Sequence, residues 1–169
     1  MSEQRNPTEA REPLWNLIKK MKFGMFTHQH ANGMLHSAPL TTQNKRIDEG
    51  SELYFFAPRD GEIVTSIQAR PSVNVAYADP GADSYVSVVG HASVREDLAK
   101  KEELFNTFAK AWFPRGATDP NLALLVVNIS HAEYWDVKES QMVQLFKMAK
   151  AAITGTPPKN MGEHAELKL

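Results

Sequence analysis

The side chains best placed to bind a ligand lie in the stretch 34–43, which reads as a β-strand ending in Thr41, Thr42 and Gln43. Proline has no N–H to donate to a sheet, so Pro39 predicts a strand at an edge or a bulge. A strand that opens at this point and then presents hydroxyl and amide groups can receive a flat polar ligand along its backbone. We expect the rest of the chain to build a small barrel around it.

A second candidate site lies where a predicted strand, a short loop and a predicted helix follow one another, from Phe55 to Ile63. A helix N-terminus presents free backbone N–H groups and a partial positive charge, and Arg59 would add a fork of donors for an anion. The local sequence alone favours a simpler interpretation, in which Asp60 caps the helix and Arg59 is solvated. Asp60 and Glu62 would also repel a phosphate unless they point away from it.

Two histidines, His28 and His30, lie on one face of a predicted strand and could bind a metal ion. Asn32-Gly33 is typical of a two-residue hairpin loop. In that register His36 pairs with Gln29 and points to the opposite face. The sequence therefore predicts no third histidine ligand and no metal site, and it favours solvated or interface histidines.

Three large aromatic residues, Trp112, Phe113 and Trp135, form a third candidate site. Because glycine, proline and aspartate lie nearby, these rings could form the wall of a site for a flat ligand or a subunit contact. Plain packing in the core explains their presence equally well. The sequence contains no Ser-His-Asp elbow, phosphate-binding glycine loop or paired-carboxylate motif. If a general acid is needed, His36 or Thr41 is the candidate.

The elements that must position these residues alternate between strands and helices. Hydrophobic periodicity and turn residues predict strands at 22–30, 34–43, 53–57, 72–78, 84–95 and 122–136, and helices at 14–21, 62–69, 97–111 and 140–153. This pattern favours an α+β barrel of about six antiparallel strands over a βαβ array. The two-residue hairpin loop would place Phe23, Met25, Ala38 and Leu40 inside the barrel. We expect a single domain over 1–153 and a disordered tail over 154–169.

The composition excludes several classes of protein. The chain has 169 residues, enough for one domain with a core, and its 19 basic and 20 acidic residues give a net charge of −1. Without a basic patch, a protein that binds nucleic acid is not expected. The absence of cysteine excludes disulfides and thiolate metal sites. The sequence contains no apolar run of membrane-spanning length and begins with no signal segment, so we expect a cytoplasmic protein that does not bind membranes.

Several segments in order resemble the pyridoxamine 5′-phosphate oxidase-like FMN-binding split-barrel proteins, in the general stress protein branch. They include the strand 36–43, the runs 53–56, 73–77 and 85–92, and the specific pieces Trp112-Phe113-Pro114 with Asp119-Pro120, and Tyr134-Trp135-Asp136. The resemblance covers roughly residues 10–150. It implies a split barrel that dimerises and binds a flavin, FMN or possibly FAD, in each of two grooves at the subunit interface.

By family position, the resemblance implies that fourteen residues lie around the flavin. Those expected beside the isoalloxazine ring and the ribityl chain are His36, Ser37, Ala38, Pro39, Leu40, Thr41, Phe55, Phe56 and Ala57. Arg59 and Asp60 would lie near the phosphate. The three aromatic residues Trp112, Phe113 and Trp135 would approach from the partner subunit or close the groove.

Two departures from the family pattern concern the phosphate. Members of this branch usually carry arginine just before the proline, where this chain has Ala38, and serine and lysine in the loop where it has residues 59–62. Each missing cation would cost about 1.5–3 kcal/mol of charge-assisted hydrogen bonding. The sequence therefore leaves open weaker binding, a preference for FAD, or loss of the cofactor.

The resemblance implies a homodimeric flavin-binding protein that is a flavin-dependent oxidoreductase acting on an unidentified small molecule. The alternatives are a non-catalytic flavin-binding module of the stress response and a dimeric scaffold that has lost its cofactor. Full vitamin-synthesis oxidase activity is not expected, because basic residues for a substrate phosphate are not found. Apolar residues on both faces of the first hairpin also favour a dimer.

Overall fold

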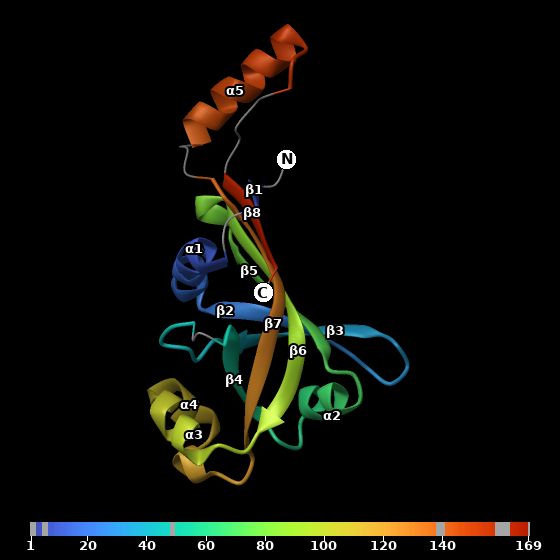
Figure 1. Ribbon diagram of the computed structural model, residues 1–169, viewed down its shortest axis with the longest axis vertical. Coiled ribbons are helices and arrows are strands. Elements are labelled where there is room, and N and C mark those ends of the chain that lie inside the picture. Colours follow the sequence, from blue (N-terminus) through green and yellow to red (C-terminus); the bar gives the residue numbers. More distant parts are fainter. Residues whose placement is uncertain (1–2, 5–6, 48–49, 138–140, 158–162, 169) are drawn as a thin grey trace.

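The computed structural model describes residues 3–4, 7–47, 50–137, 141–157 and 163–168. Figure 1 shows long strands that run through the molecule, with most helices at their sides. The strands are β1 (Glu3–Gln4), β2 (Phe23–Gln29), β3 (Leu35–Thr41), β4 (Glu52–Pro58), β5 (Ser72–Asp79), β6 (Ser84–Arg95), β7 (Leu122–Asp136) and β8 (Glu163–Lys168). The α-helices are α1 (Pro7–Met21), α2 (Glu62–Ala69), α3 (Leu98–Leu104), α4 (Thr107–Trp112) and α5 (Gln141–Thr154). Short 3-10 helices lie at Pro80–Ala82 and Gly116–Thr118.

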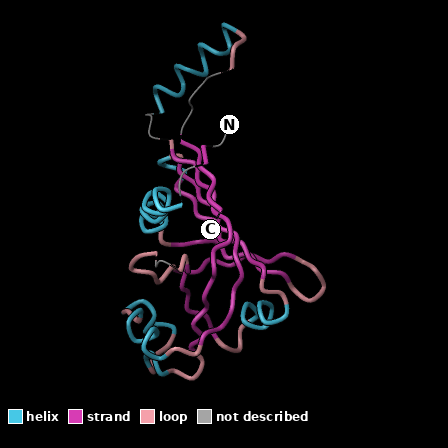
Figure 2. Tube along the Cα trace, in the orientation of Figure 1, coloured by secondary structure: helices cyan, strands magenta, loops and turns pink. Residues whose placement is uncertain are grey.

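Six of these strands form a barrel that is joined only loosely at one seam. Neighbouring strands pair antiparallel in the order β3-β2-β5-β6-β7-β4. At the seam, an isolated bridge joins Thr42 to Phe55, and the Gln43 N–H donates to the Tyr54 carbonyl at 2.8 Å. In Figure 2 the curled strands lie between the helices. The predicted α+β split barrel is thus confirmed.

Strand β7 is long enough to pair with two strands along the same edge. Its first half pairs with β4, and its second half pairs with β8, to which β1 adds in parallel. The sequence predicts a disordered tail over 154–169, but residues 163–168 form β8, with Ala165 and Leu167 buried. The alternation of these apolar residues with Glu166 and Lys168 suits a strand with one buried face. Helix α5, between β7 and β8, extends away from the barrel (Figure 1).

Among the described residues, buried side chains form two clusters on the two sides of β4 and β7. The larger cluster fills the barrel and extends to α1 and α2, and includes Phe26, Phe55 and Val75. The smaller one packs the other side of β4 and β7 against α3 and α4. The predicted helix 97–111 is in fact two helices. Asp97 caps α3 as expected, whereas the Asn106 side chain accepts from two N–H groups of α4 and starts a new helix.

The β2–β3 hairpin has a three-residue loop instead of the expected two-residue loop. The His30 N–H donates to the Met34 carbonyl at 2.9 Å, and residues 31–33 form the turn, with Gly33 at a φ of +86°. Glycine adopts this left-handed conformation without steric cost, as the last residue of a three-residue hairpin loop requires. The pairing is therefore shifted by one residue, and His36 lies opposite His28.

A one-residue shift exchanges the two faces of a strand. Phe26 and His28 are buried, whereas Phe23 and Met25, expected inside the barrel, are exposed. Ala38 and Leu40 face the same side as Phe26, as their pairing requires. The faces predicted for β2 were therefore wrong. None of the helices in the described ranges combines the length and apolar character needed to span a membrane.

Candidate functional site

Strand β3 leaves one backbone edge open. Hydrogen bonds at both ends of the hairpin, His30 N–H to Met34 and Thr42 N–H to the Lys22 carbonyl, fix which residues of β3 face β2. By the antiparallel alternation, the even-numbered residues of β3 exchange backbone hydrogen bonds with β2 and the odd-numbered ones point away. Among the described strands, none pairs along this outer side of residues 35–41. Pro39 is odd-numbered, so its missing N–H costs no ladder bond, and its predicted edge position is confirmed.

The predicted site residues on β3 divide between two faces of the sheet. His36, Ala38 and Leu40 share the face of Phe26 and His28. Ser37, Pro39 and Thr41 lie on the other face, where the Ser37 hydroxyl is 2.6 Å from the Thr27 hydroxyl. All six are exposed or half-buried. A ligand that contacts all of them would have to follow the open edge of the strand.

The predicted site residues on β4 have buried side chains. Phe55 and Ala57 lie in the barrel core, and Phe56 lies in the smaller cluster. All three side chains are buried, with Phe55 fully inaccessible. Their side chains therefore pack the protein and do not face a groove on one chain.

Arg59 is engaged away from the start of α2. Its guanidinium lies 2.6 Å from the Glu96 carboxylate, and its Nε donates to the Pro120 carbonyl at 3.2 Å. The hydrogen bond from Arg59 holds the pKa of Glu96 below its ordinary value. A shallow depression beside this pair is also lined by Leu98, Lys101, Thr118 and Asp119. Arg59 is thus part of an ion pair and is neither simply solvated nor aimed at the helix N-terminus.

The N-terminus of α2 differs from the expectation as well. The residue that caps it is Gly61, without a side-chain hydrogen bond, so Asp60 does not cap the helix. The Asp60 N–H instead donates to the side-chain oxygen of Asn121, in the loop before β7, at 3.3 Å. Glu62 is the first residue of the helix and brings a negative charge to this end.

The three aromatic candidates are not gathered within one chain. Phe113 is buried in the smaller cluster, as plain core packing would have it. Trp112 is 81% exposed at the end of α4. Trp135 lies near the other end of β7, paired with Tyr85 of β6. In Figure 1, α4 and the end of β7 that meets β8 lie at different ends of the barrel. These three residues therefore form no aromatic wall within one chain.

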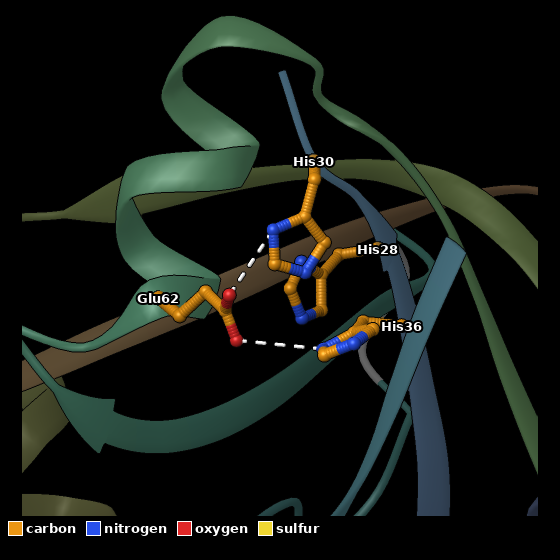
Figure 3. Close-up of side chains that lie close together, drawn as sticks. All are labelled: His28, His30, His36 and Glu62. Atoms are coloured by element: carbon orange, nitrogen blue, oxygen red, sulfur yellow. Dashed lines mark ion pairs between the residues drawn. The ribbon is translucent and has the colours of Figure 1, made fainter. Parts of the chain in front are cut away.

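The structure adds His36 and Glu62 to the pair of histidines that the sequence had placed on one face. His28, His30 and His36 lie on one face of the β2–β3 hairpin, opposite Glu62 (Figure 3). The Nδ1 atoms of His30 and His36 are 3.0 and 3.5 Å from the two carboxylate oxygens of Glu62. Burial, followed by the neighbouring His30, lowers the pKa of His28. This cluster was not predicted because the sequence indicated a two-residue loop. The three-residue loop places His36 on the same face as His28.

Helix α2 is held against this hairpin at its other end. Arg70, just after the helix, donates to the Gln29 side chain at 3.1 Å and to the Ala31 carbonyl at 3.0 Å. The buried residues Val64 and Ile67 of α2 pack into the barrel core. These contacts fix the position of the helix relative to β2 and β3, and so the position of the Glu62 carboxylate beside the imidazoles.

Solved structures of proteins named as general stress proteins resemble this chain. A putative general stress protein 26 from Jannaschia sp. CCS1 superimposes with a TM-score of 0.74 at 21% identity, over 96% of this chain and 99% of that one. General stress protein 26 from Bacillus anthracis str. Sterne gives 0.66 at 25% identity, over 75% and 93%. The general stress FMN/FAD binding protein of Xanthomonas citri gives 0.66 at 29% identity, over 79% and 92%.

No curated protein matches the chain. A family profile described as pyridoxamine 5′-phosphate oxidase like matches residues 9–159, which is most of the sequence. The split barrel and the solved relatives agree with this match. The chain belongs to the pyridoxamine 5′-phosphate oxidase-like family.

Proposed function

We propose that this protein is a homodimer that binds a flavin, FMN or FAD, along the open edge of β3, and that it uses the flavin as an oxidoreductase on a small molecule. Family membership supports the proposal, as does the Xanthomonas citri relative that is named for FMN/FAD binding. The redox chemistry belongs to the flavin, and the protein supplies binding, orientation and access.

The open edge of β3 is the observation that carries the proposal. The N–H groups of Ser37 and Thr41 and the carbonyls of Ser37 and Pro39 point away from β2. Such groups bind the polar edge of a flat ring in the same way that a peptide adds to a sheet edge. The exposed side chains on both faces of β3 leave this edge accessible.

The phosphate end of a flavin fits this chain less well than the ring. Glu62 brings a carboxylate to the N-terminus of α2, Ala38 carries no charge, and Arg59 is paired with Glu96. Two unit charges of like sign about 5 Å apart repel by about 3 kcal/mol at an effective dielectric constant of 20. The residues therefore fit the ring and the ribityl chain and do not fit a phosphate placed at α2.

A second subunit would complete the groove. Exposed apolar side chains lie on the sheet face opposite to Phe26, including Met25 of β2, Val89 and Tyr85 of β6, and Trp135 of β7. Contiguous exposed apolar side chains of this kind mark an interaction surface. The dimer would cover them. Tyr85→Glu should then shift the mass in solution from dimer to monomer, and an unchanged dimer would exclude this face as the interface.

A second candidate function follows from the misfit at the phosphate. A dimeric scaffold without a cofactor is favoured by the same two observations, the Glu62 carboxylate at α2 and the pairing of Arg59 with Glu96. The two functions differ in flavin affinity. A non-catalytic flavin binder differs from the enzyme in turnover alone, since the enzyme would oxidise a reduced nicotinamide when an acceptor is present.

The test is a fluorescence titration of the purified chain with riboflavin, FMN and FAD, in buffer that contains a chelator. The proposal predicts saturable binding of all three. It also predicts that Glu62→Gln tightens FMN binding and leaves riboflavin binding unchanged, because FMN carries a phosphate and riboflavin does not. Glu103→Gln, an exposed glutamate paired with Lys100 on α3, is the matched control and should change neither. If no flavin binds at tens of micromolar, the proposal is overturned and the dimeric scaffold without a cofactor is the remaining candidate function.

A further inference from the structure

The cluster of His28, His30, His36 and Glu62 offers four ligand atoms in one place. Each residue contributes one nitrogen or carboxylate oxygen, and all four atoms lie within 4.8 Å of one another. The ring centres of His30 and His36 are 4.3 Å apart, and those of His28 and His30 are 5.1 Å apart. In Figure 3 the three imidazoles and the carboxylate surround a common space. The arrangement does not depend on a flavin or on a second subunit.

The hydrogen bonding in this cluster is incomplete. His28 is only 2% exposed, yet its Nδ1 has no hydrogen-bond partner within the described part of the chain. The buried Nε2 of His30 also lacks a partner there. Buried polar atoms in proteins are almost always satisfied, so two unsatisfied imidazole nitrogens in one cluster need an explanation. A network that only joins His30 and His36 to Glu62 leaves these two atoms unexplained.

The spacing and the charge suit a divalent cation. Nitrogen and oxygen ligands bound to zinc at 2.0–2.2 Å in a tetrahedron lie about 3.3–3.6 Å from one another. The four candidate ligand atoms lie within 4.8 Å of one another, and the Nδ1 atoms of His30 and His36 are 3.0 and 3.5 Å from the two different oxygens of Glu62, close to this spacing. With neutral imidazoles the four residues carry one net negative charge. Three imidazoles and a carboxylate are a ligand set that suits zinc and neighbouring transition metals.

We propose that His28, His30, His36 and Glu62 bind a divalent transition-metal ion, with Zn²⁺ the best match. The strands and the helix hold three of the four ligands on rigid elements, and the Arg70 contacts fix α2 against the hairpin. His36 and Glu62 are about half-exposed, so the ion can enter from solvent and accept a further oxygen ligand from that side. The bound ion would reverse the negative charge at the N-terminus of α2.

The experiment is a calorimetric titration of the chelator-treated, desalted full chain with Zn²⁺ in the absence of flavin. Titration with Co²⁺ adds a spectroscopic readout, since the visible absorption of a bound Co²⁺ ion reports its ligand geometry. The proposal predicts saturable binding of one ion per chain. Changes to residues that only orient a ligand already weaken metal sites by about 10–100-fold. Loss of a ligand in His36→Ala or Glu62→Gln should therefore weaken Zn²⁺ binding at least that much.

Both variants change half-exposed side chains, so they should fold, which circular dichroism and a cooperative thermal transition would verify. The matched control is His131→Ala, because His131 forms a similar histidine–glutamate pair with Glu166, at 3.6 Å, outside the cluster. It should leave Zn²⁺ affinity unchanged. No saturable binding by the wild-type chain, or equal binding by the His36→Ala and Glu62→Gln variants, would overturn the proposal. The flavin titration contains chelator and this one contains no flavin, so either proposal can fail without the other.

Discussion

The seam of the barrel depends on a buried hydrogen bond between two hydroxyl groups. The Thr42 Oγ1 lies 2.7 Å from the Tyr77 hydroxyl, and both side chains are buried. Burial raises the pKa of Tyr77, so its hydroxyl stays protonated and can donate. Thr42 also forms the bridge that joins the end of β3 to β4. This bond therefore helps to hold the edge strand, along which we place the flavin, against the barrel.

Thr42→Val keeps the shape of the side chain and leaves the Tyr77 hydroxyl buried without its partner. An unsatisfied buried hydroxyl costs about 1–3 kcal/mol of unfolding free energy. For a domain of this size each kcal/mol corresponds to roughly 2–4 °C, so the melting temperature should fall by about 2–12 °C. Tyr77→Phe should cost a similar amount. The double variant should cost less than the sum, because both polar partners are then absent.

Urea unfolding, followed by circular dichroism, would measure all three free energies. The control is Thr27→Val, which breaks the same kind of hydroxyl pair, with Ser37, at an exposed position. Because water can replace the lost partner there, this change should stay within about 0.5 kcal/mol of wild type. If Thr42→Val lowers the free energy of unfolding no more than Thr27→Val, the hydrogen bond does not stabilise the seam. The same holds if the effects of Thr42→Val and Tyr77→Phe are fully additive in the double variant.

Three further predictions concern the rest of the barrel. A Cβ on Gly90 would clash with the Asn128 carbonyl oxygen, so Gly90→Ala should lower the free energy of unfolding by about 1–3 kcal/mol in urea melts. A neutral effect would contradict the close approach at this bulge. The Arg95 guanidinium, which donates to both oxygens of Glu52, lowers the pKa of that carboxyl. The Glu52 carboxyl therefore binds a proton more readily in the unfolded chain than in the folded one. The contribution of this ion pair to the free energy of unfolding is complete above the ordinary carboxyl pKa of 4.5 and is lost as pH falls through the lower pKa of the folded state. Melting temperatures measured from about pH 6 to pH 3 should therefore fall less steeply for Glu52→Gln than for wild type, and parallel profiles would exclude this linkage. Leu167→Asp places a carboxylate in the buried face of β8 and should cost about 3 kcal/mol or more, whereas tolerance of the change would mean that β8 does not pack on the barrel.

Most of the barrel could be predicted from the sequence because its signals are local. Strand β6 has the bounds predicted for it, and Val86 and Val88 alternate with the more exposed Tyr85 as expected. The start of α2 at Glu62 was also predicted, since Pro58 to Gly61 ends the preceding strand. Alternation and turn residues act over a few positions, which is the range that a single sequence reveals.

The site was harder to predict because it depends on one-residue and long-range choices. Asn32-Gly33 suits a two-residue loop, but the chain adds Ala31 to the turn, and this exchanges the faces of β2. Arg59 finds its partner Glu96 after two intervening strands, a pairing that no local pattern reveals. Of the adjacent pair Trp112 and Phe113, only the second is buried, because the end of α4 turns it towards β7.

Crystals grown with Zn²⁺ would test the central structural claim, that the hairpin register gathers three histidines opposite Glu62. Anomalous diffraction at the zinc absorption edge locates the ion independently of the protein coordinates. The account predicts one strong peak about 2.0–2.2 Å from ligand atoms of His28, His30, His36 and Glu62. No peak at this site, or a map in which His36 and His28 lie on opposite faces of the hairpin, would contradict it.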